Sequence, residues 1–137
     1  MNVAIVKYNA GNIRSVDYAM KRLGVEAVIT ADKEVLMAAD KVIFPGVGEA
    51  ETTMNHLRAT GLDELIKNLK QPVLGICLGM QLMCRYSEEG DTNCLNIFCG
   101  DFRRDSILYS VGTLRKNRNG KPRIIRRTSN SFLMCLD

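Results

Sequence analysis

The sequence predicts an α/β fold in which a parallel, or mixed, sheet is covered by helices on both faces. Over about the first ninety residues, short continuous apolar runs alternate with stretches whose apolar residues recur at helical spacing. This alternation is typical of parallel strands that are buried on both faces and joined by helices. The length of 137 residues suits one domain, and 46% hydrophobic with 25% charged residues excludes disordered chains and disulfide scaffolds.

The expected elements follow one another closely along the chain. Residues 3–6 form the first apolar run, and apolar residues spaced between Ile13 and Leu23 predict a helix capped by Asn12 and ended by Gly24. The next expected elements are a strand at 26–30, a helix at 32–39 with Asp32 as N-cap, a strand at 41–44 stopped by Pro45 and Gly46, and a weak helix at 49–59. The last are an amphipathic helix at 62–69, a strand at 72–76 and a helix at 78–86. In such sheets, sites lie at the carboxyl ends of the strands.

The charge is unevenly distributed. Residues 1–98 carry ten Lys and Arg against twelve Asp and Glu, whereas residues 99–137 carry nine against three. A basic end can indicate nucleic-acid binding, but this segment offers few aromatic side chains for stacking on bases. The longest apolar run, near Val73–Met80, is too short to span a membrane, and the amino terminus does not resemble a secretory signal. We therefore expect a cytoplasmic protein without nucleic-acid or membrane partners.

The five cysteines and one histidine do not suggest metal chemistry. No two cysteines form a C-x-x-C pair, and His56 is the only histidine, so no zinc site of known spacing can be assembled. Disulfides are not expected in a cytosolic chain. We expect neither a metal ion nor another cofactor.

The strongest motif is Leu74-Gly-Ile-Cys-Leu-Gly-Met-Gln81, in which Cys77 stands between Gly75 and Gly79 where a strand meets a helix. This matches the nucleophile-elbow pattern, with cysteine as the nucleophile. Larger side chains at the two glycines would crowd the tight turn. The helix terminus would help activate the thiol, and the Leu78 amide would supply one oxyanion donor. The alternative is an ordinary core cysteine at the end of a buried strand.

A second motif, Phe44-Pro-Gly-Val-Gly48, follows another expected strand at the same edge of the sheet. Its glycines allow the backbone to turn its amides outward, so the peptide groups of Val47 and Gly48 could supply a second oxyanion donor. The alternative is a simple strand-ending turn. A nucleophile and two converging amide donors are what acyl transfer requires.

With these motifs the chain resembles class I, or triad, glutamine amidotransferases, and among them the glutaminase subunits of imidazole glycerol phosphate synthases. The resemblance covers about residues 1–98 and is carried by four motifs in order: Tyr8-Asn-Ala-Gly-Asn-Ile-Arg-Ser-Val16, Phe44–Gly48, Gly75–Leu82 and Ser87-Glu-Glu-Gly90. It implies that Cys77 attacks the side-chain amide of glutamine while the Leu78 amide and the Val47–Gly48 loop hold the oxyanion.

The same resemblance implies substrate-binding roles for Gly46, Gln81 and Glu89, with Glu89 facing the ammonium group of glutamine. The alternatives are that Gln81 is a solvated helix residue and that Glu89 belongs to an exposed charge run. The resemblance also implies a (β/α)₈-barrel cyclase partner in a heterodimer. Ammonia would pass to that partner, shielded from water, to make imidazole glycerol phosphate and aminoimidazole carboxamide ribotide in histidine biosynthesis.

The resemblance ends near Phe98. The family takes its base and orienting carboxylate from a late His-x-Glu segment, but this chain has no histidine after His56, and Asn96 replaces an expected glycine. We expect residues 1–98 to form a partial amidotransferase domain, incomplete at its carboxyl end, and residues 99–137 to be an unrelated basic segment, disordered or out of frame. The competing interpretations are a natural basic tail and, for the whole chain, a non-catalytic binding or regulatory module.

Overall fold

The computed structural model describes residues 1–9, 12–98 and 100–103, together with the backbone of residues 111–116, 122–127 and 133–136. Its five described helices are α1 (Ile13–Arg22), α2 (Lys33–Ala38), α3 (Ala50–Thr60), α4 (Leu62–Asn68) and α5 (Leu78–Met83). The strands of the larger sheet are β1 (Val3–Val6), β2 (Ala27–Thr30), β3 (Lys41–Gly46), β4 (Val73–Cys77), β8 (Val111–Lys116), β9 (Pro122–Arg127) and β10 (Leu133–Leu136). A smaller sheet contains β5 (Tyr86–Ser87), β6 (Thr92–Asn93) and β7 (Asp101–Phe102).

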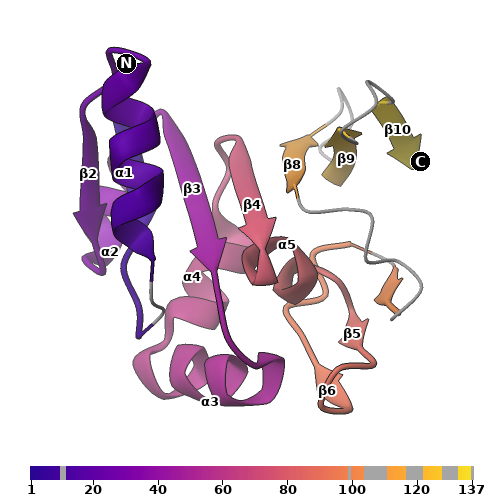
Figure 1. The fold of residues 1–137 in the computed structure, drawn as a ribbon. Coiled ribbons are helices and arrows are strands. Elements are labelled where there is room, and N and C mark those ends of the chain that lie inside the picture. Colours follow the sequence, from indigo (N-terminus) through magenta and orange to yellow (C-terminus); the bar gives the residue numbers. More distant parts are fainter. Residues whose placement is uncertain (10–11, 99, 104–110, 117–121, 128–132, 137) are drawn as a thin grey trace.

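The larger sheet is mixed, as expected. In the part of the chain that is described, its strand order is β10-β9-β8-β4-β3-β1-β2. The first four strands in sequence pair in parallel, whereas β8 runs antiparallel to β4 and is followed by β9 and β10 (Figure 1). Because the parallel strands share one direction, the loops that follow β1, β3 and β4 leave the same edge of the sheet.

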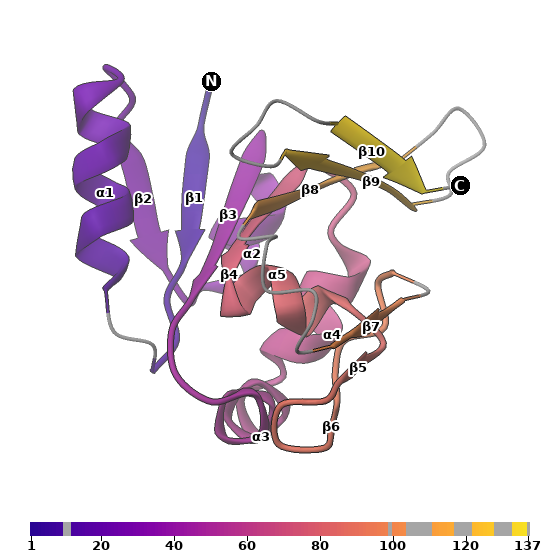
Figure 2. The ribbon, with the colours of Figure 1, turned by 45° about the vertical axis from the view of Figure 1, so that its right-hand side comes forward.

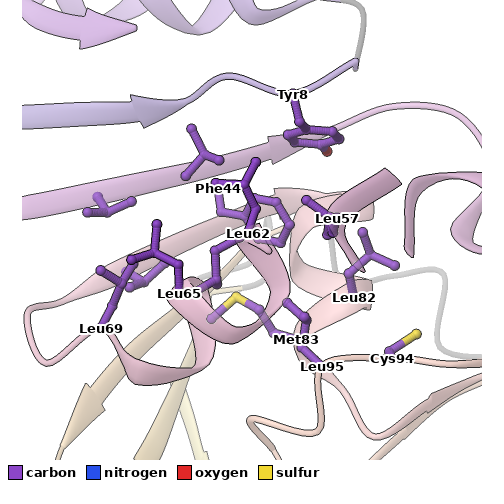
Figure 3. Packing of buried hydrophobic residues seen from close by; sticks show 14 of the residues in the cluster. Tyr8, Phe44, Leu57, Leu62, Leu65, Leu69, Leu82, Met83, Cys94 and Leu95 are labelled. Carbon is purple, nitrogen blue, oxygen red and sulfur yellow. The ribbon is translucent and has the colours of Figure 1, made fainter. Parts of the chain in front are cut away.

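Helices cover both faces of the parallel strands, which confirms the predicted α/β class. Figure 2 shows α1 on one side of the sheet and α3, α4 and α5 on the other. On the α1 face, Val3, Ile5 and Ile43 form a small buried cluster. On the opposite face, a larger cluster joins the sheet to four helices, and Figure 3 shows Phe44 among leucines from α3, α4 and α5. All four residues of β1 are buried, as expected for a strand packed on both faces.

Two of the three predicted helix-end features are confirmed. The Asp32 carboxylate accepts hydrogen bonds from the amides of Glu34 and Val35 at 2.8 and 3.2 Å, which caps α2. Gly24 follows α1 with φ of 72°, the left-handed conformation that a closing glycine adopts. The predicted side-chain cap at Asn12 is wrong, because Asn12 itself is left-handed and its side chain instead accepts a hydrogen bond from the Ser15 hydroxyl.

Two element boundaries differ from prediction by two residues or more. Pro45 and Gly46 do not stop β3 but continue it, paired with Ile76 and Cys77 of β4. Proline is tolerated there because the ladder between β3 and β1 ends at Ile43, so no bond to β1 needs its missing N–H. The helix after β4 ends at Met83 instead of residue 86, since the extended backbone of Cys84 leads the chain into β5.

Candidate active site

Cys77 has the backbone conformation that the elbow pattern predicts. It is the last residue of β4 and the N-cap of α5, its φ and ψ are 51° and −120°, and its side chain is exposed. A cysteine at positive φ is sterically strained, and such strain persists only where the surrounding structure imposes it. The interpretation of Cys77 as a buried core cysteine is therefore wrong.

The glycines on either side of Cys77 are required by close packing. A Cβ atom at Gly75 would lie 2.7 Å from both the Cα of Met80 and the sulfur of Met83. A Cβ atom at Gly79 would overlap the main-chain carbonyl of Phe44 on β3. Both contacts confirm that larger residues at these positions would crowd the turn, because the first turn of α5 lies directly against the ends of β3 and β4.

The loop after β3 begins beside Cys77. Gly46 pairs with Cys77 in the sheet, and a Cβ atom at Gly46 would lie 2.5 Å from the Gly79 amide nitrogen. Beyond it, Val47 is 44% exposed, and Gly48 has φ of 102° with open space around the position of a Cβ atom. The structure thus brings the two predicted motifs together at neighbouring strand ends, with an open loop next to an exposed thiol.

Tyr8 supports this loop, a contact that the sequence analysis did not predict. Its hydroxyl donates a hydrogen bond of 2.5 Å to the carbonyl oxygen of Pro45, and its ring packs against Phe44 with centroids 5.5 Å apart. Burial raises the pKa of Tyr8 well above its ordinary value, so the hydroxyl keeps its proton and remains a donor. The end of β1 therefore anchors the end of β3.

The third and fourth motifs meet through Gln81, Ser87 and Glu89. Gln81 is 5% exposed, so the interpretation of it as a solvated helix residue is wrong. Its side-chain nitrogen Nε2 donates to Ser87 Oγ at 2.6 Å and to Glu89 Oε2 at 2.9 Å. Gln81 lies in α5, four residues after Cys77, which is the N-cap of this helix.

Asn96 explains how the chain tolerates a departure from the family pattern. Its φ is 51°, in the left-handed region that glycine occupies readily and asparagine more easily than most other residues. The main-chain N–H of Asn96 donates a hydrogen bond of 2.8 Å to the carbonyl oxygen of Cys84, which connects the segment after β6 to the end of α5. Asparagine therefore suits the left-handed conformation that the expected glycine would also adopt readily.

His56 lies on α3, on the side of the ends of β1 and β2. It lines an open hollow of about 530 Å³ at the ends of β1 and β2, whose other lining residues are Lys7, Tyr8, Asn9, Ile29, Thr30 and Ala31. Cys77 is not among them. Within the described ranges, three or more His, Cys, Asp or Glu side chains nowhere gather as a metal ion would require. The helices of the described part are too short or too polar to cross a membrane.

The fold is that of the class I glutamine amidotransferases. The family model "Glutamine amidotransferase class-I" matches residues 4–132, and the chain belongs to this family. That match extends past residue 98, where the sequence resemblance to the family was expected to end. That residues 99–137 are an unrelated basic segment stays a prediction. Much of that segment lies outside the described residues.

Among named proteins, the chain is similar to subunits of one synthase. It is 83% identical over 104 residues to "Imidazole glycerol phosphate synthase subunit HisH" of Bacteroides thetaiotaomicron, a match covering 76% of this chain and 53% of that protein. It is 51% identical to the subunit of the same name from Nitratidesulfovibrio vulgaris, covering 98% of this chain and 66% of the relative. The chain thus spans about half the length of the first of these relatives.

A solved structure shares the fold. The chain matches a protein described as "Crystal structure of glutamine amidotransferase" with a TM-score of 0.57 and 20% identity, over 90% of this chain and 69% of that one. This likeness bears on the fold alone and agrees with the mixed sheet and its helical layers.

Proposed function

We propose that this chain derives from a glutaminase subunit, with Cys77 as the nucleophile. The observation that carries the proposal is an exposed thiol at a strained strand-to-helix junction, four residues from a buried glutamine that is hydrogen-bonded to Glu89. The Sγ of Cys77 would bond to the side-chain carboxamide carbon of glutamine, and the proton lost by the thiol would pass to the amide nitrogen, which leaves as ammonia. Water would then cleave the glutamyl thioester to glutamate and restore the thiol.

The other site residues have supporting roles in this proposal. The Leu78 amide and the Val47–Gly48 loop would stabilise the oxyanion, since both adjoin the thiol along neighbouring strand ends. The family resemblance places Gly46 beside the substrate, and its lack of a side chain allows the loop to pack against Gly79. Gln81 and Glu89 would bind the amino end of glutamine.

The names of the relatives support a partner and a pathway. We propose that ammonia from this subunit is delivered to a (β/α)₈-barrel cyclase subunit in a cytoplasmic heterodimer. The products would be imidazole glycerol phosphate and aminoimidazole carboxamide ribotide, which places the reaction in histidine biosynthesis. Delivery within a complex keeps ammonia unprotonated and nucleophilic. Mixing the chain with a cyclase subunit and measuring co-elution tests the pairing, and separate elution would contradict it.

The sequence as given limits the rate that this chain can reach. It has no histidine after His56, so no side chain of the expected His-x-Glu segment can act as base. Loss of a triad member lowers turnover by several powers of ten. We therefore expect glutamine hydrolysis by this chain to be at least about a thousandfold slower than by a full-length relative. A rate equal to that of the relative would show that another base acts.

The second candidate is a non-catalytic binding or regulatory module, which the absent histidine favours. A chloromethyl ketone analogue of glutamine separates the two candidates, because it alkylates a thiol without needing the triad. Selective adduct formation at Cys77, mapped against the other four cysteines, supports the glutaminase site. Equal labelling of all five cysteines contradicts it. Translation of the gene in its other frames downstream of the Phe98 codon tests whether a His-x-Glu segment has been displaced.

A further inference from the structure

The buried hydroxyl of Ser87 is in contact with both members of the proposed substrate-binding pair. Ser87 is the last residue of β5 and has no exposed surface. Its Oγ accepts a hydrogen bond of 2.6 Å from Gln81 Nε2 and donates one of 3.2 Å to the main-chain oxygen of Glu89. One hydroxyl therefore links the side chain of α5 to the turn that follows β5.

These bonds determine which end of the Gln81 amide is left available. An amide nitrogen has two hydrogens, and those of Gln81 are directed to Ser87 Oγ and Glu89 Oε2. No described residue donates to its carbonyl oxygen Oε1. Gln81 is 5% exposed, and no fully buried side-chain oxygen or nitrogen of the described residues lacks a partner, so this carbonyl oxygen is not wholly enclosed. The amide thus keeps its carbonyl acceptor uncommitted among the described residues, beside the Glu89 carboxylate to which its nitrogen donates.

We propose that Ser87 is a positioning residue, which orients the Gln81 amide and the Glu89 turn so that two oxygen acceptors face the α-ammonium group of glutamine. An ammonium group carries only donors, so a carbonyl oxygen beside a carboxylate is suited to it. The inference rests on the proposed function. It adds that selection for a free α-amino group depends on a residue that does not itself touch the substrate.

The test compares two alkylating probes that share one electrophile. The first is the chloromethyl ketone analogue of glutamine; the second is the same compound without its α-amino group. In both, Cys77 Sγ bonds to the chloromethyl carbon and chloride leaves, so the des-amino probe reports a formed elbow and an accessible thiol. The preference is the ratio of the two second-order rates of adduct formation at Cys77, measured on the full chain.

For the unaltered chain we expect the amino probe to be preferred. Ser87→Ala should lower that preference about tenfold or more, the size of one charge-assisted hydrogen bond, and leave the des-amino rate unchanged. Ser87→Thr keeps the hydroxyl and should restore the preference. Ser87→Cys, close to serine in volume but a weak acceptor, should repeat the loss if the alanine variant does not fold.

Thr92→Val is the matched control. Thr92 lies opposite Ser87 in the small sheet, is 4% exposed, and donates to the Gly90 carbonyl oxygen at 2.9 Å in the same turn, but it does not bond to Gln81. We expect this variant to keep the preference. A preference that survives Ser87→Ala, or that falls equally in Thr92→Val, overturns the inference while the proposed function stands. No preference in the unaltered chain overturns both.

Discussion

The two ends of α5 carry cysteines in opposite surroundings. At its start, Cys77 is exposed at a positive φ between glycines that hold β3 and β4 against the helix. At its end, Cys84 is buried near Cys94, and burial together with the neighbouring Cys84 thiol raises the pKa of Cys94 to about 12. The six residues of α5 thus separate the exposed sulfur of Cys77 from the buried sulfurs of Cys84 and Cys94. The surroundings of each cysteine, and not the residue type, therefore decide its reactivity.

The largest expected effect is a difference in thiol reactivity. Because the pKa of Cys94 lies about three units above its ordinary value of 9.0, its thiolate fraction near neutral pH should be about a thousandfold below that of an ordinary thiol. Iodoacetamide labelling of the native chain, followed by peptide mapping, should find Cys77 modified before Cys84 and Cys94, with Cys94 almost unmodified. Labelling in urea should abolish the difference. Equal labelling rates for Cys77 and Cys94 in the native chain would contradict the predicted difference in reactivity.

The second prediction concerns the packing that presents Cys77. Gly79→Ala would place a methyl group on the Phe44 carbonyl, so we expect the free energy of unfolding to fall by about 3 kcal/mol. Urea denaturation measures the change. Gly100→Ala is the control, since no atom of the described residues lies within 4 Å of its Cβ position. Similar losses in both variants would show that the elbow is not tightly packed.

A smaller loss is expected when the support of the β3 loop is removed. Tyr8→Phe leaves the buried carbonyl oxygen of Pro45 without its donor and should lower the free energy of unfolding by about 2 kcal/mol. The exposed Tyr18 provides the control variant Tyr18→Phe, which should have no measurable effect on urea denaturation. An unchanged midpoint for Tyr8→Phe would mean that water replaces the hydroxyl.

The smallest expected effect lies at the far end of α5. Arg85 forms two hydrogen bonds of 2.9 and 3.0 Å with Asp101 and so lowers the pKa of that carboxyl below its ordinary value. A carboxyl with a lowered pKa stabilises the fold at pH values above its ordinary pKa of about 4. This stabilisation is lost as the pH falls below that value and the carboxylate takes up a proton. Asp101→Asn should therefore change the urea midpoint slightly near neutral pH and not at all near pH 2. A larger change at low pH would reverse the assigned sign.

The sequence predicted the order of helices and strands because each depends on local periodicity. Apolar spacing identified α1 and α4, and Asp32 was correctly placed as a cap, since a cap needs only the next three residues. Boundaries failed where a distant partner decides them. Pro45 remains in β3 because β4 pairs with it and β1 does not, which no local pattern reveals.

For the candidate site, the motif by itself determined the elbow. The glycines two residues before and after Cys77 allow α5 to approach β3 and β4 closely, and Cys77 itself takes the positive φ at the turn. Only the tertiary structure decided what supports that turn. Tyr8 and Pro45 stand 37 residues apart, and Gln81 meets Glu89 only because the chain reverses after α5. Such contacts pair buried polar groups that are distant in the sequence. Which groups meet is decided only when the whole core has packed.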